Sequence, residues 1–349
     1  MSWRILLLTK NYPPQIWGIE KYAYDLYNKL VQEWNDIKII TAGPRSEFLL
    51  ANKQWNIFWS ILYIFYEIFR LFSFWLKAFF GGLWWCLMKK GDLLVWSIDW
   101  SIAWLGVIIA RSSFLIIGHK KNIFLRATGH GRDIAFNHYL YQKILHFWLV
   151  NTDDIFVVSQ DIKKLVVSLW IDERKIEVKE HSLETISLSK ISNFDRTEFL
   201  WTYKILPNKV LLFSIGRFVE KKWFHWFIAE VLPYLDNRFH YILAGSGPLE
   251  DYIRRIVRDK NLHNITLVWP IVDSVEKGKL YSSVDYFLMP NISVKWDYEG
   301  YGIVLLESQF YNLKSIVANT DGINTRVTDH DVILPSGIAT TWVEYLNSL

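Results

Sequence analysis

The chain has 349 residues, of which 51% are hydrophobic and 21% are charged, and its formal net charge is +4. This composition excludes a disordered chain, and the small charge excess does not indicate nucleic-acid binding. The length favours two domains, while the single cysteine, Cys86, excludes an intramolecular disulfide and favours a reducing compartment.

The first half alternates short apolar runs with amphipathic segments. The runs predict buried strands at Ile5–Thr9, Ile37–Thr41, Leu93–Ser97, Ile123–Ala127 and Ile155–Ser159. The segments between them predict helices at Ile19–Trp34, Ser101–Arg111, Asn137–Leu149 and Asp161–Leu169. This alternation is typical of βαβ units on a parallel sheet covered on both faces. The opening run does not resemble a signal peptide, because it is short and leads directly into a Pro-rich turn.

Residues Trp55–Met88 are dense in aromatic and aliphatic side chains, and Glu67, Arg70 and Lys77 are their only charges. Glu67 and Arg70 interrupt the run near its middle and can pair at i, i+3. One interpretation is helices buried against the first sheet. Another is an aromatic surface in a membrane interface, with Lys77 and the lysines after Met88 near lipid headgroups. A transmembrane span is a third interpretation, although the charges interrupt the run.

The alternation restarts after Glu180–Asn208, a polar stretch in which we place the domain linker. The second half predicts strands at Val210–Ile215, Tyr241–Ala244, Ile265–Val268, Tyr286–Met289 and Ser315–Ala318. It predicts helices near Phe224–Leu235, Leu249–Arg258, Val275–Ser283 and Ile303–Tyr311. We therefore expect an α/β protein with two doubly wound, Rossmann-like domains, residues 1–190 and 191–349, facing each other across a cleft.

Three loops at predicted strand ends contain parts of an anion site. The loop after the first strand has a Pro-Pro turn and then Gly18 directly before a helix. In the second half Gly216 follows a strand, and Arg217 and Lys222 bring two cations that can neutralise a diphosphate. Gly245-Ser-Gly-Pro248 forms a further tight turn after the next strand. Each loop alone is a weak signal.

Glu299 and Glu307 stand eight positions apart, in Glu-Gly-Tyr-Gly-Ile-Val-Leu-Leu-Glu. In a loop that leads into a helix, Gly300 and Gly302 let the backbone approach a ligand, and free N–H groups at the helix start can receive phosphate. Carboxylates accept hydrogen bonds from sugar hydroxyls, so the segment suits a phosphorylated sugar. The alternative interpretation is an amphipathic helix with solvated carboxylates.

Taken in order, the motifs resemble glycosyltransferase family 4, which comprises retaining enzymes of the GT-B fold that use nucleotide sugars. The resemblance extends from the first strand to about Gly322, and the ordered set is specific although each motif is weak. The motifs are Asn11-Tyr-Pro-Pro, His130-Gly-Arg-Asp133, Gly216-Arg217 with Glu220-Lys-Lys222, Gly245-Ser-Gly-Pro248, Leu280-Tyr-Ser-Ser-Val-Asp285 with Met289-Pro290, and Glu299-x7-Glu307.

The resemblance implies roles for the matching residues. Arg217 and Lys222 would bind the donor diphosphate, and stabilising its developing charge would be the largest catalytic contribution. Glu299 would contact the transferred sugar and Glu307 the ribose. The implied catalytic residues are Glu299, His130, Arg217 and Lys222. The implied donor-binding residues are Gly18, Gly216, Arg217, Lys222, Gly245, Gly300, Tyr301, Gly302, Ile303 and Glu307. No metal site and no obligatory cofactor are implied.

The resemblance also implies an activity. A hexosyl group would pass with retention from a UDP- or GDP-sugar to a glycan or lipid-linked acceptor, in cell-surface polysaccharide or glycolipid synthesis. We expect residues 1–190 on the acceptor side and residues 191–349 to bind the donor. We expect a cytoplasmic protein, and membrane contact through residues 55–90 is one interpretation. The alternative is a non-catalytic GT-B protein that binds a nucleotide sugar or acts as a membrane scaffold. An oxidoreductase is disfavoured, because no G-x-G-x-x-G motif opens a helix with an acidic residue about twenty positions on.

Six positions at which the family usually has glycine carry tryptophan, namely Trp17, Trp34, Trp170, Trp223, Trp269 and Trp296. Independent mutations would scatter over many residue types. We therefore hypothesise that one triplet, decoded as glycine in the source organism, is translated here as tryptophan. In the alternative the tryptophans are genuine, and indoles at Trp17 and Trp223 crowd the phosphate loops and weaken the enzyme.

Overall fold

The computed structural model describes residues 4–10, 12, 18–33, 36–42, 57–88, 92–117, 122–130, 134, 139–179, 194–268, 274–294, 302–320, 323 and 326–349. The chain divides into two compact units, Met1–Glu180 and His181–Leu349. The expected domain boundary at 190/191 lies in residues 180–193, outside the described residues.

The first unit is built on a parallel six-stranded sheet with the order β2-β1-β3-β4-β5-β6. Its strands are β1 Arg4–Thr9, β2 Asp36–Thr41, β3 Leu93–Ser97, β4 Ile123–Gly129, β5 Asp154–Val157 and β6 Ile176–Val178. Leu6, Leu7 and Leu8 of β1 are all fully buried, because helices cover both faces of the sheet. The predicted parallel α/β architecture of this half is confirmed.

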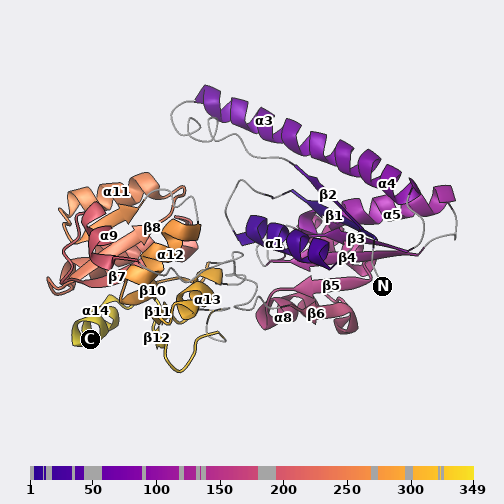
Figure 1. Cartoon of the computed structure of the whole chain (residues 1–349). Helices are drawn as coiled ribbons and strands as arrows, with labels where there is room; N and C mark the ends of the chain where they lie inside the picture. Colours follow the sequence, from indigo (N-terminus) through magenta and orange to yellow (C-terminus); the bar gives the residue numbers. More distant parts are fainter. Residues whose placement is uncertain are drawn as a thin grey trace. The chain divides into compact units, whose positions relative to one another are not determined.

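Helices α3 and α4 form one continuous rod along the first unit, next to α5 (Figure 1). Gly82, the first residue of α4, permits this packing, since a Cβ there would lie 3.1 Å from side-chain atoms of both Leu6 and Ile109. The helical segments of this unit are α1 Gly18–Gln32, α3 Ile57–Leu76, η1 Lys77–Gly81, α4 Gly82–Met88, η2 Trp100–Ile102, α5 Ala103–Ile117, α7 Tyr139–Val150, α8 Gln160–Ser168 and η3 Glu173–Lys175.

The second unit is built on another parallel six-stranded sheet, with the order β12-β11-β10-β7-β8-β9. Its strands are β7 Val210–Ile215, β8 Phe239–Ala244, β9 Ile265–Val268, β10 Tyr286–Met289, β11 Lys314–Ala318 and β12 Val332–Leu334. Along β7, Leu212 belongs to one apolar cluster while Leu211 and Phe213 belong to another, as expected for a sheet covered on both faces.

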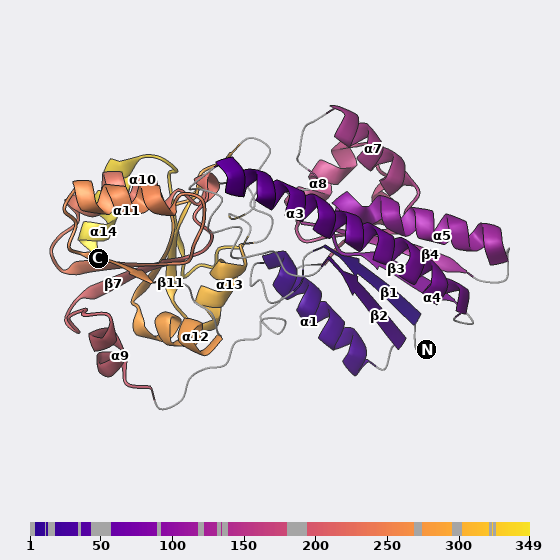
Figure 2. The same cartoon turned by 90° about the horizontal axis from the view of Figure 1, so that it is seen from above.

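The helices of the second unit surround this sheet (Figure 2). They are α9 Arg196–Thr202, η5 Glu220–Lys222, α10 Phe224–Trp226, η6 Phe227–Val231, η7 Leu232–Tyr234, α11 Glu250–Asp259, α12 Ser274–Ser283, α13 Ile303–Phe310 and α14 Ala339–Ser348. The helix predicted at Phe224–Leu235 is present as an uninterrupted helical run over Phe224–Tyr234, whose hydrogen bonding changes from α in α10 to π in η6 and 3-10 in η7, the piece that contains Pro233.

Helix α9 corrects the predicted linker, Glu180–Asn208, because it lies inside that stretch. The Asp195 side chain caps the helix by accepting hydrogen bonds from two backbone amides, at 2.7 and 3.1 Å. Leu200 is buried in the second unit, and Arg196 forms an ion pair with Asp285 at 3.1 Å. Polar capping residues and a short apolar stretch made this helix resemble a linker in the sequence.

Candidate functional site

The strand order of the second unit identifies where a ligand of this fold binds. Chain order runs outward from β7 through β8 to β9 on one side, and from β10 through β11 to β12 on the other. The topological switch point therefore lies between β7 and β10, and ligands of open α/β sheets bind outside the carboxyl ends of the strands at such a point. Gly216 directly follows β7, and the loop to α13 follows β10.

The loops after β7 and β8 contact each other through their backbones. A Cβ on Gly245, which has φ +133°, would lie 2.0 Å from the Gly216 carbonyl oxygen. A Cβ on Gly247 would lie 2.5 Å from the carbonyl oxygen of Phe218. The Phe218 amide donates to the Ser246 carbonyl at 2.7 Å. Only glycine fits at 245 and 247, and this contact fixes the loop that carries Arg217.

Lys222 lies at the same edge, at the end of η5, and only 8% of it is exposed. A Cβ on Gly216 would lie 3.7 Å from Lys222 Cε, so the lysine side chain runs beside the end of β7. The Ile292 amide donates to the Lys221 carbonyl at 3.0 Å, which connects η5 to the loop after β10. Arg217 is exposed. The two predicted cations thus lie on one short loop at the switch point.

The start of α13 lies near the end of β10. Gly302 precedes the helix with φ 60°, a left-handed conformation that glycine adopts without strain. A Cβ on Gly302 would lie 3.9 Å from Met289 Cε, and Ile303 is the first helical residue. Glu299, Gly300 and Tyr301 lie outside the described residues, so their roles stay predictions.

Glu307 is buried in α13 and only 1% exposed, so the alternative of a solvated carboxylate is wrong for this residue. Its Oε1 accepts from the Lys277 ammonium, and its Oε2 accepts from the Tyr281 hydroxyl at 2.9 Å. Burial and the nearby Glu307 carboxylate raise the pKa of Tyr281 well above its ordinary value, so this hydroxyl stays protonated as a donor. Sequence reasoning missed both partners, because nothing in the spacing indicates the pairing.

In the first unit, His130 follows β4, and its Nε2 lies 2.9 Å from the carbonyl oxygen of Ile98, just after β3. A carbonyl can only accept, so Nε2 carries a hydrogen, and Nδ1 is the acceptor when the ring is neutral. The Tyr22 ring contacts the imidazole edge-on, with centroids 5.1 Å apart. Burial raises the pKa of Tyr22 to about 12. Gly18 begins α1.

Lys10 and Asp99 stand at the switch point of the first sheet, between β1 and β3. Lys10 Nζ lies 4.0 Å from Asp99 Oδ1, and Asp99 is 1% exposed. Sequence reasoning missed this pair, although both residues follow predicted strands closely. Among the residues that the structure describes, no group of three or more His, Cys, Asp or Glu side chains is arranged to hold a metal ion.

Two of the six unusual tryptophans, Trp170 and Trp223, lie among the described residues. Both have left-handed backbones, with φ 62° and 52°. The other tryptophans of the described part of the chain have no positive φ. This region favours glycine and costs roughly 1–2 kcal/mol for a residue with a Cβ. The backbone therefore supports the glycine hypothesis at both positions, and Trp17, Trp34, Trp269 and Trp296 lie outside the described residues.

Residues 209–349 match the family described as "Glycosyl transferases group 1". A protein of Bacillus subtilis (strain 168) named as a glycosyltransferase, EpsF, is 29% identical over 119 residues, which cover 33% of this chain and 29% of EpsF. HepE of Anabaena, solved in complex with UDP-glucose, has 12% identity and a TM-score of 0.69 over 99% of this chain and 89% of its own. Sucrose-phosphate synthase of Thermosynechococcus elongatus has 16% identity and a TM-score of 0.69, and the match again covers 99% of this chain and 89% of the other.

These comparisons confirm the predicted fold and match residues 209–349 to a glycosyltransferase family, whereas the narrower assignment to glycosyltransferase family 4 stays a prediction. The two parallel sheets and their helices match the known structures over nearly the whole chain. The family match covers residues 209–349, which contain Gly216, Lys222 and Glu307. The chain therefore has the GT-B fold, and the match to the group 1 glycosyltransferase family covers residues 209–349 of its second unit.

Proposed function

We propose that the whole chain is a retaining glycosyltransferase of family 4, which transfers a hexosyl group from a nucleotide-diphosphate sugar to a glycan or lipid-linked acceptor. The observation that carries the proposal is Lys222, a largely buried ammonium beside Gly216 at the switch point of the donor sheet. A cation at such a position suits a diphosphate. HepE, which shares the fold, was solved with UDP-glucose, and we propose a UDP- or GDP-sugar as the donor here.

In this proposal the protein acts mainly on the departing diphosphate. Arg217 and Lys222 neutralise the charge that develops as the bond to the anomeric carbon breaks. Backbone amides at the start of α13 hold phosphate, as helix N-termini do. Glu299 contacts the hydroxyls of the transferred sugar, and His130 contributes from the first unit. The diphosphate itself can accept the proton of the acceptor, so no pair of hydrolase-type carboxylates is required.

We further propose that the acceptor belongs to cell-surface polysaccharide or glycolipid synthesis, and that the protein acts in the cytoplasm at the membrane surface. The motif resemblance supports this setting, together with the aromatic segment discussed below. The competing proposal is a GT-B protein that binds a nucleotide sugar without turning it over. The two proposals differ in whether Glu299 contributes to turnover.

Thermal shift with UDP, GDP and their hexose conjugates tests donor binding. We expect one nucleotide series to raise the melting temperature, since a ligand at a hundred times its dissociation constant stabilises by about 2.7 kcal/mol. Lys222→Ala should abolish the shift, whereas Lys260→Ala, at an exposed lysine at the end of α11, should leave it unchanged. No response to any nucleotide would contradict the proposal.

Turnover separates the enzyme from the non-catalytic alternative. The wild-type protein should release nucleoside diphosphate from its donor, and NMR should show that the anomeric configuration is retained. Glu299→Ala should keep the thermal shift and lose turnover. Release at the wild-type rate in E299A, or inversion of the product, would contradict the proposed mechanism.

A further inference from the structure

The inner side of the rod formed by α3, η1 and α4 is a regular buried stripe. Every fourth residue from Arg70 onward packs against the first unit, and the stripe consists of Arg70, Phe74, Ala78, Gly82 and Cys86. Gly82 lies against Leu6 of β1 and Ile109 of α5, at distances that leave no room for a side chain. The rod is therefore part of the first unit's core and not a separate helix.

The outer side of the same rod is also apolar, and we call it the outer stripe. Its members are 43% to 71% exposed and follow one another at intervals of three or four residues: Phe65, Phe69, Phe72, Leu76, Phe80, Trp84 and Met88. A helix on the surface of an ordinary globular protein carries polar side chains on this side. Here both sides are apolar, so burial in the first unit accounts for only one of them.

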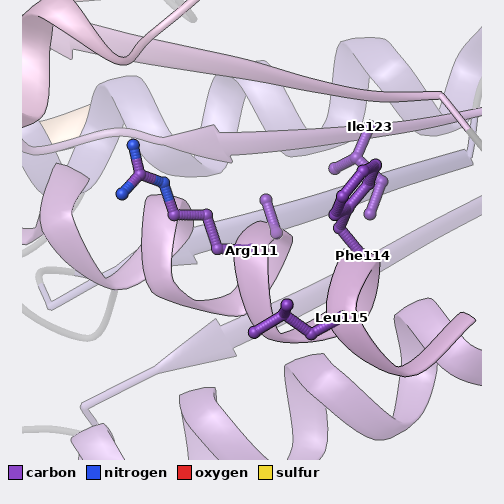
Figure 3. A pocket seen from close by; sticks show the side chains of 5 residues that line it. Arg111, Phe114, Leu115 and Ile123 are labelled. Atoms are coloured by element: carbon purple, nitrogen blue, oxygen red, sulfur yellow. The ribbon is translucent and has the colours of Figure 1, made fainter. Parts of the chain in front are cut away.

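Helix α5 extends this surface. Trp75 contacts Trp104 with ring centroids 5.7 Å apart, and Gly82 contacts Ile109, so α5 runs in the same direction as the rod. The last turns of α5 expose Phe114, Leu115 and Ile116, at 46%, 83% and 62%. A shallow hollow of about 430 Å³ lies beside them (Figure 3), lined by Ala110, Arg111, Phe114, Leu115 and Ile123.

The exposed apolar area is larger than usual. Seven half-exposed large side chains on the outer stripe present on the order of 800 Å², since large aromatic side chains contribute about 150–250 Å² each when fully covered. The largest apolar patch on a typical monomer is about 300–600 Å², and larger patches mark interaction sites. The outer stripe together with the end of α5 is therefore a candidate docking surface.

Most charges around this surface are positive, and the exception is the exposed Asp92, which accepts a hydrogen bond from Asn122 beside the hollow. Arg70 pairs with Glu67 at 2.9 Å, which leaves Lys77 and Arg111 as the other charges of α3, η1, α4 and α5 beyond residue 64, and both are exposed. In the sequence, α4 leads directly into Lys89-Lys90, and α5 is followed by Lys120-Lys121. An apolar strip that carries Lys77 and Arg111 complements an anionic lipid surface, into which the apolar side chains insert while the cations meet the headgroups.

We propose that the outer stripe and the end of α5 dock the protein on an anionic lipid membrane, with the rod lying in the plane of the interface. Of the described helices, Phe65–Met88 is long and apolar enough to span a bilayer, but its buried stripe, from Arg70 to Cys86, packs into the first unit. A second copy of the chain is disfavoured, because two such faces would bring positive borders together. The proposal rests on this surface alone and is independent of the donor site.

Vesicle sedimentation of the full chain tests the proposal, with phosphatidylcholine vesicles that either contain or lack phosphatidylglycerol. We expect binding to the anionic vesicles that weakens with added salt. Phe80→Gln/Trp84→Gln should lower the partition coefficient by about tenfold or more, because it removes two inserting aromatic side chains. The matched control is Trp201→Gln/Tyr234→Gln, which changes two equally exposed aromatics of the second unit and should bind like wild type.

Two further measurements separate a loss of membrane binding from a loss of folding. Circular dichroism and the nucleotide-induced thermal shift report whether F80Q/W84Q is folded, and K222A should still bind vesicles even where it fails to bind nucleotide. The proposal is overturned if the wild-type protein does not bind anionic vesicles. It is also overturned if a folded F80Q/W84Q variant binds them as well as wild type does. A dimer in analytical ultracentrifugation that this variant dissociates overturns it too.

Discussion

The ammonium group of Lys277, on α12, pairs with the carboxylate of Glu307, on α13, and the Tyr281 hydroxyl binds the other oxygen of the same carboxylate. Glu307 is almost fully buried while Lys277 retains some exposure. The second carboxylate of the Glu299–Glu307 motif is thus held in place by α12 in the described structure. The position of the Glu307 side chain therefore depends on Lys277, which lies thirty positions away in the sequence.

Lys277→Met should destabilise the protein by about 3 kcal/mol, because it leaves the Glu307 carboxylate buried without its cation. Glu307→Gln in the same background should recover part of this loss, since it removes the uncompensated charge. Urea unfolding of the two single variants and the double variant measures the coupling. Lys279→Met on the same helix is the control. Equal stability of K277M and K279M would show that the pair is not energetically important.

Gly245→Ala should destabilise the second unit and abolish nucleotide binding. The new Cβ would meet the carbonyl oxygen of Gly216 at 2.0 Å, so the loop carrying Arg217 must move. Gly81→Ala is the matched control, because its Cβ would meet only side-chain atoms at 3.8 and 3.9 Å. Thermal unfolding with and without nucleotide measures both effects. A G245A variant with wild-type stability and binding would refute the role assigned to the loop contact.

The tryptophan at 170, whose side chain is 90% exposed, should be replaceable by glycine at no cost. Trp170→Gly should leave stability unchanged or raise it by up to about 1 kcal/mol, because glycine relieves the left-handed backbone. Trp223→Gly gains the same relief but loses the stacked contact with Trp226, whose ring centroid lies 4.8 Å away, so its gain should be smaller. Trp201→Gly, in the last turn of α9, should instead lower stability, by up to about 1 kcal/mol, as glycine does in a helix. Thermal unfolding ranks the three variants. Peptide mass spectrometry of the protein from its own cells should read glycine at all six positions, and tryptophan there would reject the hypothesis.

Stability should fall as the pH decreases from about 6.5 to about 4 because of His240. Burial, followed by the charge of Lys209, lowers the pKa of His240 from 6.5 to about 4, so the folded protein keeps the ring neutral while the unfolded chain protonates it. Protonation therefore favours unfolding in this window and has no further effect below it. His225 has its pKa lowered by burial and acts in the same direction.

Chemical denaturation at a series of pH values checks this expectation. His240→Gln keeps a polar group that can reach the Thr266 hydroxyl, which lies 2.8 Å from the native ring nitrogen, and should flatten the dependence between pH 6.5 and 4. His263→Gln, at a histidine in the loop after α11, is the control. An H240Q protein with the same pH dependence as wild type would contradict the assignment.

Much of the fold was predictable because its strands are continuous apolar runs with helices between them. Leu6 to Leu8 and Leu211 to Phe213 are buried on both faces, and such runs give a clear signal. The strands β6 and β12 were missed because three residues carry too little pattern. The helix predicted to end at Leu235 ends at Tyr234, and only its change from α to π and 3-10 hydrogen bonding had no signal in the apolar periodicity.

The candidate site was predictable only where the chemistry is local. Gly216, Lys222 and Gly302 each lie beside a strand end or a helix start, so their place at the sheet edge followed from order along the chain. The partners Lys277 and Tyr281 of Glu307, and the pairing of Lys10 with Asp99, depend on how distant elements approach each other. No spacing rule contains that information.

The backbone contact between Gly216 and Gly245 also restricts how this protein can acquire a new donor preference. No side chain can stand between the loops after β7 and β8, since a single methyl group would already clash there. Substitutions that change which base or sugar is accepted must therefore arise in other loops of the sheet edge. Libraries aimed at new donors should randomise the segments after β10 and β11 and leave Gly245 and Gly247 untouched.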